Sequence, residues 1–111
     1  MRLAATVLAT FVLLATSIVA TTESRTFIGT ISDSMCARDH AAMKIDPVED
    51  CVRECTQHST DVRYVLLHDR HVYILSDQET PAKFAGKKVT VKGVLYTKTN
   101  VIKVESIEAA K

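Results

Sequence analysis

The chain of 111 residues contains no tryptophan, only three glycines and only two prolines. It has no glycine-rich loop of the kind that binds phosphate groups, and it has no internal repeat or low-complexity tract. Neither charge predominates, because 14 basic residues stand against 13 acidic ones, which argues against a general polyanion binder. The length is too short for a two-domain enzyme with a large cofactor. We therefore expect one small domain that is not an enzyme.

The N-terminal residues differ in composition from the rest. Arg2 is followed by an uncharged apolar run over residues 3–20, which ends in the small residue Ala20. This pattern predicts a secretory signal peptide over residues 1–20 and a mature domain over residues 21–111, exported to the periplasm or the cell exterior. An uncleaved anchor is the alternative, because the run is just long enough to cross a bilayer. After cleavage we expect no membrane span.

The second half of the chain has the pattern of β-structure. Two segments rich in β-branched and aromatic residues predict a hairpin, and alternating Lys/Thr and Val residues from position 88 predict a further strand. The predicted strands cover residues 25–32, 62–67, 71–76, 88 up to a turn at 97–100, and 101–107. Gly93 inside a strand indicates a bend or bulge. Residues 80–86 predict a short helical turn that Thr80 caps and Gly86 ends.

Helical signals fill the segment after the first strand. Ser32, Asp33 and Ser34 are good helix caps before a segment of helical composition at 35–43. Asp46-Pro47-Val48-Glu49 forms a capping box that predicts a helix from Pro47 to about His58. The predicted fold is β-rich α+β: a small five-stranded OB-like barrel with a two-helix, cysteine-bearing insertion at about 33–59, after the first strand.

Three motifs carry a resemblance that covers nearly all of the mature chain. GTISDSMC at 29–36, CVREC at 51–55 and FAGKKVTVKGVL at 84–95 resemble a family of small exported bacterial proteins of unknown function. The resemblance implies export and a β-rich domain. It implies no mechanism.

All three cysteines lie in the predicted insertion. Cys36, His40 and Met43 are spaced to share one face of the first predicted helix, and Cys51, Cys55 and His58 have the same spacing on the second. If the helices pair antiparallel, sulfur and imidazole groups converge, and these ligands suit copper or zinc, with copper preferred. The predicted ligand set is Cys36, His40, Cys51 and Cys55, with His58 and Met43 as extras. The C-x3-C pair also resembles, locally, the copper site of oxidase-assembly copper chaperones.

Other interpretations of the cysteines stay open. Exported proteins oxidise their thiols, so Cys36 could be cross-linked to Cys51 or Cys55, which would leave one thiol over. The cysteines could also be inert members of an apolar helix face. His68 and His71, beside the predicted hairpin turn, form a weaker second metal candidate. The alternative function is therefore a disulfide-stapled envelope or secreted binding module without metal.

Nucleic acid is a poor candidate partner. Residues 80–111 contain seven lysines against two acidic residues, and an OB-like barrel could present them to a single strand. Such sites stack bases on aromatic side chains, of which the chain has few, and export removes the protein from most nucleic acid. Alternating lysines on a strand also discourage aggregation. The partner we expect is an unidentified protein or a metal donor.

Overall fold

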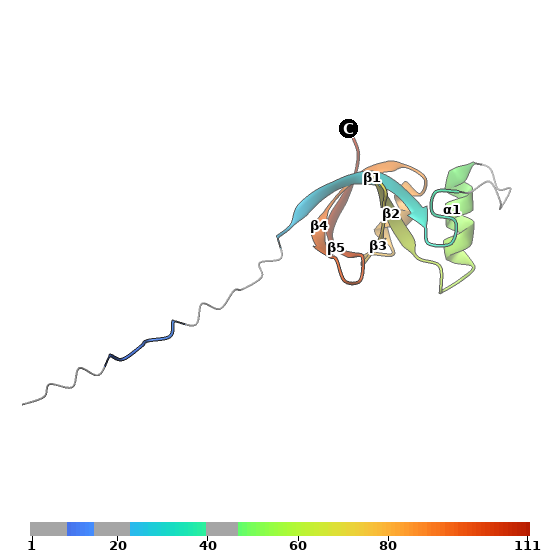
Figure 1. Ribbon diagram of the computed structural model, residues 1–111. Coiled ribbons are helices and arrows are strands. Elements are labelled where there is room, and N and C mark those ends of the chain that lie inside the picture. Colours follow the sequence, from blue (N-terminus) through green and yellow to red (C-terminus); the bar gives the residue numbers. More distant parts are fainter. Residues whose placement is uncertain (1–8, 15–22, 40–46) are drawn as a thin grey trace, which may run out of the picture.

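The computed structural model describes residues 9–14, 23–39 and 47–111 of the chain. These residues form a β-rich domain with five strands, one α-helix and one 3₁₀ helix (Figure 1). In chain order the elements are β1 (Arg25–Asp33), α1 (Val48–Gln57), β2 (Tyr64–His68), β3 (His71–Leu75), the 3₁₀ helix η2 (Thr80–Phe84), β4 (Lys88–Tyr96) and β5 (Val101–Ala109). The five predicted strands and the short helical turn before the last two are confirmed.

The strands pair into a closed barrel in the order β1-β2-β3-β5-β4. All neighbouring strands are antiparallel except β3 and β5, which run parallel and pair only through Ile74 with Val101 and Leu75 with Ile102. The long strand β4 pairs with β1 on one side and with β5 on the other. Alternate side chains point inward and fill the barrel, as the period-2 pattern predicts.

The core is apolar and includes one residue of the helix. Its fully or nearly buried members are Phe27, Ile31, Val52, Tyr64, Leu66, Tyr73, Leu75, Ala85, Val89, Val91 and Ile102. Val52 belongs to α1. This helix lies beside the C-terminal end of β1 (Figure 1). The helix is therefore anchored to the barrel through its apolar face and does not stand apart as a separate insertion.

Two glycines permit close approaches that a larger residue would prevent. The predicted irregularity at Gly93 is confirmed as a register shift between Lys92 and Gly93 in the β4–β5 pairing. A Cβ atom at Gly93 would lie 2.3 Å from the carbonyl oxygen of Lys103. Gly86, which follows η2, has a φ of +73°, and a Cβ there would lie 2.9 Å from Cγ of Glu49 in α1. Gly86 therefore lets α1 approach this turn.

The turns differ in detail from the prediction. His68 and His71 pair with each other as strand residues, so the β2–β3 turn consists of Asp69 and Arg70, with Asp69 at a φ of +52°. Thr80 is the first residue of η2 and not its cap, because Glu79 occupies the N-cap position. Oδ1 of Asp77 accepts hydrogen bonds from the backbone N–H groups of Glu79 (2.9 Å) and Thr80 (3.0 Å) in the turn before η2. A short carboxylate that bonds nearby backbone amides stabilises such turns.

Of the two predicted helices, only the second is seen among the described residues. α1 spans Val48–Gln57, within one residue of the predicted limits, although the predicted cap Asp46 lies outside those residues. After β1 the chain forms a turn over 34–38 in which Ala37 has a φ of +48°, so the expected helix does not begin there. The prediction of a two-helix insertion is therefore not supported. Residues 40–46 lie outside the described part of the chain.

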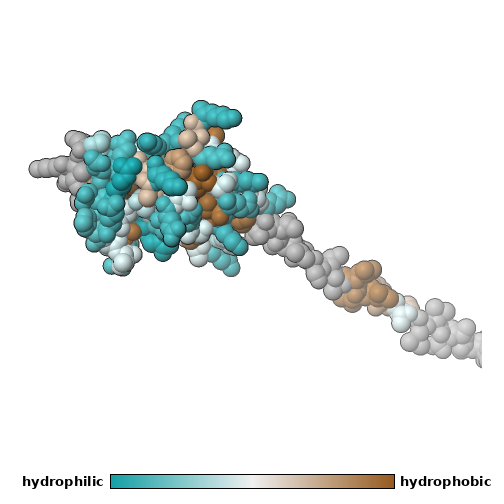
Figure 2. Space-filling model, turned by 180° about the vertical axis from the view of Figure 1, so that it is seen from behind, coloured by the Kyte–Doolittle hydropathy of each residue, from teal (hydrophilic) through white to brown (hydrophobic). Residues whose placement is uncertain are grey.

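The predicted signal segment is described only at residues 9–14. These residues form neither helix nor strand, and the side chains at 11–14 are 76–92% exposed. Figure 2 shows their apolar character as brown atoms beyond the domain. In the described part of the chain, no helix combines the length and apolar character that a membrane crossing needs. The signal peptide and its cleavage stay predictions.

Candidate metal centre

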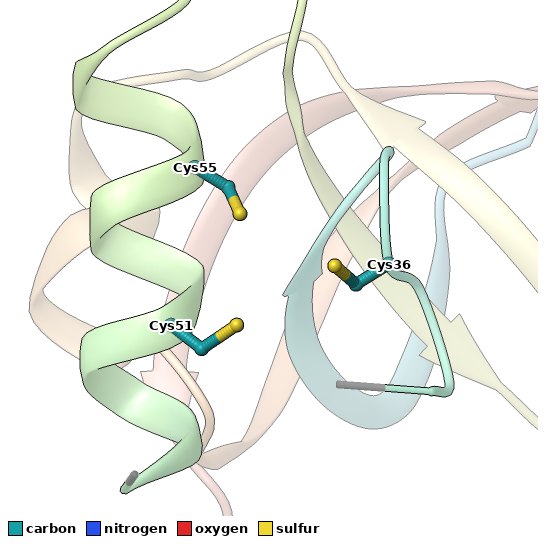
Figure 3. Close-up of side chains that lie close together, drawn as sticks. All are labelled: Cys36, Cys51 and Cys55. Carbon is teal, nitrogen blue, oxygen red and sulfur yellow. The ribbon is translucent and has the colours of Figure 1, made fainter. Parts of the chain in front are cut away.

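Three thiols converge between the helix and the turn that follows β1. The Sγ atoms of Cys36, Cys51 and Cys55 all lie within 4.8 Å of one another. Figure 3 shows the sulfurs of Cys51 and Cys55 directed from α1 toward the turn, and the sulfur of Cys36 directed back toward the helix. We call these three residues the thiol cluster. It brings together positions from two separate elements.

Helical spacing and core packing position the two thiols of α1. Cys51 and Cys55 are one turn apart and both are buried, because they share the helix face that carries Val52 into the barrel core. The hydroxyl of Thr56 donates to the carbonyl oxygen of Val52 at 2.9 Å within the same helix. The two thiols are thus held on a helix whose own position is set by the core.

Asp33 positions the third thiol. It is the last residue of β1 and is fully buried, and its Oδ1 accepts hydrogen bonds from the backbone N–H groups of Met35 (3.0 Å) and Cys36 (2.8 Å). Its backbone carbonyl accepts a third bond, from the N–H of Ala37 at 2.9 Å. These bonds have the pattern of a helix N-cap, but Ala37 has a left-handed φ of +48°, so the turn does not continue as the predicted first helix.

Two serines secure the same turn to its surroundings. The hydroxyl of Ser32 donates to the carbonyl oxygen of Ala37 at 2.6 Å. Ser34 exchanges two bonds of 2.9 Å with Arg63: its N–H donates to the Arg63 carbonyl, and its hydroxyl oxygen accepts from the Arg63 N–H. The sequence pattern predicts these serines to be helix caps. They instead brace the turn that carries Cys36 against the segment before β2.

The environment keeps the thiols protonated. Burial raises the pKa of Cys36 above its ordinary value of 9.0, and the negative charge of Asp33 raises it further. Burial is also the main cause of the raised pKa of Cys55, again followed by Asp33, and of Cys51, where the charge of Cys36 comes second. Thiolates in this space repel one another and the carboxylate, so a cation among them would relieve the repulsion.

The spacing of the sulfurs suits a shared ion better than a covalent bond. A disulfide requires about 2.05 Å between sulfurs. All three cysteines are described, and none is bonded to another. Three thiolates around one zinc ion, at bonds of about 2.3 Å, lie about 3.8 Å apart. Small side-chain movements would bring a cluster with separations below 4.8 Å to that geometry.

Of the other sequence-predicted ligands, only His58 lies in the described part of the chain, and it does not join this cluster. His40 and Met43 lie outside the described residues. His58 has a side chain that is 75% exposed and binds Glu54 on its own helix, with 2.9 Å between Nε2 and Oε2. Met35 is exposed, although its backbone N–H bonds Asp33. Sequence reasoning thus identified the three thiols but attributed their convergence to a pair of helices.

His68 and His71, the second predicted metal candidate, belong to an aromatic cluster. Nδ1 of His68 lies 2.8 Å from the carbonyl oxygen of Ile28, and the imidazole stacks on Tyr73 at 6.3 Å between ring centroids. The ring of His71 stacks on the same tyrosine at 5.4 Å. Among the described residues, neither histidine belongs to a group of three or more side chains placed to share a metal ion.

The fold and the site together define a small β-barrel domain with a buried three-cysteine cluster. Residues 61–110, which hold β2 to β5, match a family described as "Protein of unknown function (DUF5818)". This match agrees with a resemblance to an uncharacterised family, and all three cysteines lie before the matched residues. No curated protein and no solved structure matches the chain.

Proposed function

We propose that this protein binds one soft transition-metal ion, copper or zinc, through the thiolates of Cys36, Cys51 and Cys55. The observation that carries the proposal is the convergence of three sulfurs, within 4.8 Å, from two separate elements. Soft thiolate ligands select Cu(I) and Zn(II) over hard cations such as Mg²⁺ and Ca²⁺. The role is binding and not catalysis.

The arrangement of Cys36 favours a ligand role over that of inert apolar thiols. Cys51 and Cys55 alone would fit the ordinary apolar face of an amphipathic helix. Cys36, however, is carried on a turn that Asp33 and Ser34 brace, and its sulfur points toward the helix (Figure 3). A preorganised ligand on a braced turn lowers the entropic cost of binding an ion. A half-buried residue with a packing role alone would not need the hydrogen bonds that brace this turn.

We further propose that the barrel is OB-like and that the protein is exported, with residues 1–20 removed. The closed five-stranded ring and the helical turn between β3 and β4 support the first statement. The apolar run after Arg2 supports the second. A metal-donor protein would be the natural partner of an exported site of this kind. N-terminal sequencing of the exported protein should begin at Thr21, and a first residue of Met1 would contradict cleavage.

Native and denaturing mass spectrometry test the binding proposal directly. The protein, purified without chelator or reductant, should show a full set of protonated thiols when denatured and one retained copper or zinc ion when native. Cys51→Ser and Cys36→Ser should each abolish retention, with folding checked by circular dichroism. His58→Ala is the matched control, because the exposed imidazole of His58 lies at the C-terminal end of the same helix, and its loss should leave the stoichiometry unchanged.

A different result would overturn the proposal in favour of the alternative function. A denatured mass two hydrogens below the reduced value, with no ion in the native spectrum, would mean a disulfide and one spare thiol. The protein would then be a stapled binding module, and Cys51→Ser would lower its thermal stability without any effect on metal content.

A further inference from the structure

A buried carboxylate lies beside the thiol cluster without belonging to it. Asp33 is fully buried, and none of its oxygens is among the ligand atoms that lie within 4.8 Å of one another. It nevertheless touches the site through the backbone, because its Oδ1 accepts the N–H of Cys36 at 2.8 Å. Its negative charge also acts on each of the three cysteines. Asp33 therefore has both a geometric and an electrostatic connection to the cluster.

The geometric connection determines where the Cys36 sulfur can lie. Two backbone amides share Oδ1, and Ala37 donates to the backbone carbonyl of the same residue at 2.9 Å. These bonds define the turn between β1 and Cys36. Groups that orient a metal ligand from outside the ligand shell commonly change metal affinity by about 10- to 100-fold when they are altered.

The electrostatic connection distinguishes ions by their charge. Three thiolates around a divalent ion leave one net negative charge, whereas three thiolates around a monovalent ion leave two. A further fixed negative charge nearby attracts a divalent ion twice as strongly as a monovalent ion at the same place. It also makes the more negative monovalent complex the costlier of the two in a buried setting.

We propose that Asp33 is the residue that determines specificity at the thiol cluster: it positions Cys36 through its backbone amide and biases the site toward a divalent soft ion, Zn(II), over monovalent Cu(I). This inference rests on the proposed metal-binding function and reverses the preference for copper that the sequence alone suggested. Asp33 acts through Cys36 and through its charge, and it does not bind the ion.

Asp33→Asn separates the two contributions. The amide oxygen of Asn still accepts both backbone N–H groups, whereas the charge is lost. Asp77→Asn is the matched control, because Oδ1 of Asp77 accepts the same pair of backbone bonds, from Glu79 and Thr80, and its charge is not among the causes of the raised cysteine pKa values. Asp33→Ser, which keeps one acceptor oxygen, replaces the first variant if Asn prevents folding.

The dissociation constants of Zn²⁺ and, without oxygen, of Cu⁺ are measured for each protein by competition with chromogenic chelators. We expect Asp33→Asn to reduce the preference for Zn²⁺ over Cu⁺ by about tenfold, because loss of the charge favours the doubly negative Cu⁺ complex more than the singly negative Zn²⁺ complex, while Asp77→Asn leaves the preference unchanged. An equal change for both ions would mean a purely structural role, and no change would mean no role; either overturns the inference. If the unaltered protein binds neither ion, the proposed function itself fails.

Discussion

Each thiol of the cluster lies where water cannot readily solvate a charge. Cys51 and Cys55 are buried, Cys36 is half-buried, and burial is the largest cause of the raised pKa of all three. Because the thiolate is both the nucleophile and the metal ligand, the metal-free site should be chemically quiet near neutral pH. Metal binding must then release protons from the thiols.

This environment predicts slow alkylation of the folded, metal-free protein. Since the folded pKa values are raised above 9.0, the thiolate fraction at pH 7.5 is smaller than in the unfolded chain, and the rate should rise with pH toward a midpoint above 9.0. Iodoacetamide labelling followed by mass spectrometry, with and without denaturant, measures this. We expect at least about a tenfold difference at pH 7.5. Equal rates in both states would contradict the described environment.

The helix α1 couples the barrel core to the thiol cluster. Its residue Val52 is completely buried among the barrel side chains, and Cys51 and Cys55 lie one turn apart on the same buried side of the helix. The third thiol, that of Cys36, lies on the turn that faces α1, and hydrogen bonds hold this turn to Asp33 of β1 and to Arg63. The site therefore depends on how α1 docks, and a change in the core should reach the thiols.

Val52→Ala should loosen that docking. Loss of two buried carbon groups and the resulting cavity should lower the free energy of unfolding by about 2 kcal/mol. Affinity for the metal should fall as well, because two of the three ligands lie on α1. Val48→Ala is the control, since Val48 lies on the same helix but is 42% exposed. Urea denaturation measures stability; similar losses for the two variants would argue against Val52 as the anchor of the helix.

At the scale of the whole molecule, barrel closure brings the parts of the site together. β1 pairs with both β2 and β4, and its last residue, Asp33, lies opposite Tyr64 at the start of β2. The unfolded chain holds Cys36 and the two helical cysteines with no fixed separation. An ion that binds all three thiols therefore prefers the folded state and should stabilise it.

A metal-dependent melting temperature is the corresponding prediction. At a free ion concentration of about 100 times the dissociation constant, binding should add about 2.7 kcal/mol to the free energy of unfolding. Differential scanning calorimetry with buffered Zn²⁺ should show a higher melting temperature for the natural sequence and no shift for Cys51→Ser. A shift of the same size in both proteins would place the stabilising ion elsewhere on the molecule.

Local pattern was sufficient to predict most of the elements. The alternation of Val with Lys and Thr predicted β4, the Asp-Pro-x-Glu segment predicted α1 within one residue, and Gly93 predicted the bulge. These features depend on neighbours in the chain, so a single sequence contains the necessary information. The spacing and the odd number of the three cysteines likewise predicted them as candidate metal ligands.

The tertiary structure alone decided how the thiols meet. Cap residues such as Asp33 and Ser34 begin a helix or close a turn with the same hydrogen-bonding groups, and the choice depends on partners far away in the chain, such as Arg63. The burial of Asp33 beside the cysteines also depends on barrel closure, which brings β1, β2 and α1 together. The sequence by itself therefore determined which thiols could act, whereas long-range packing determined their geometry and the charge beside them.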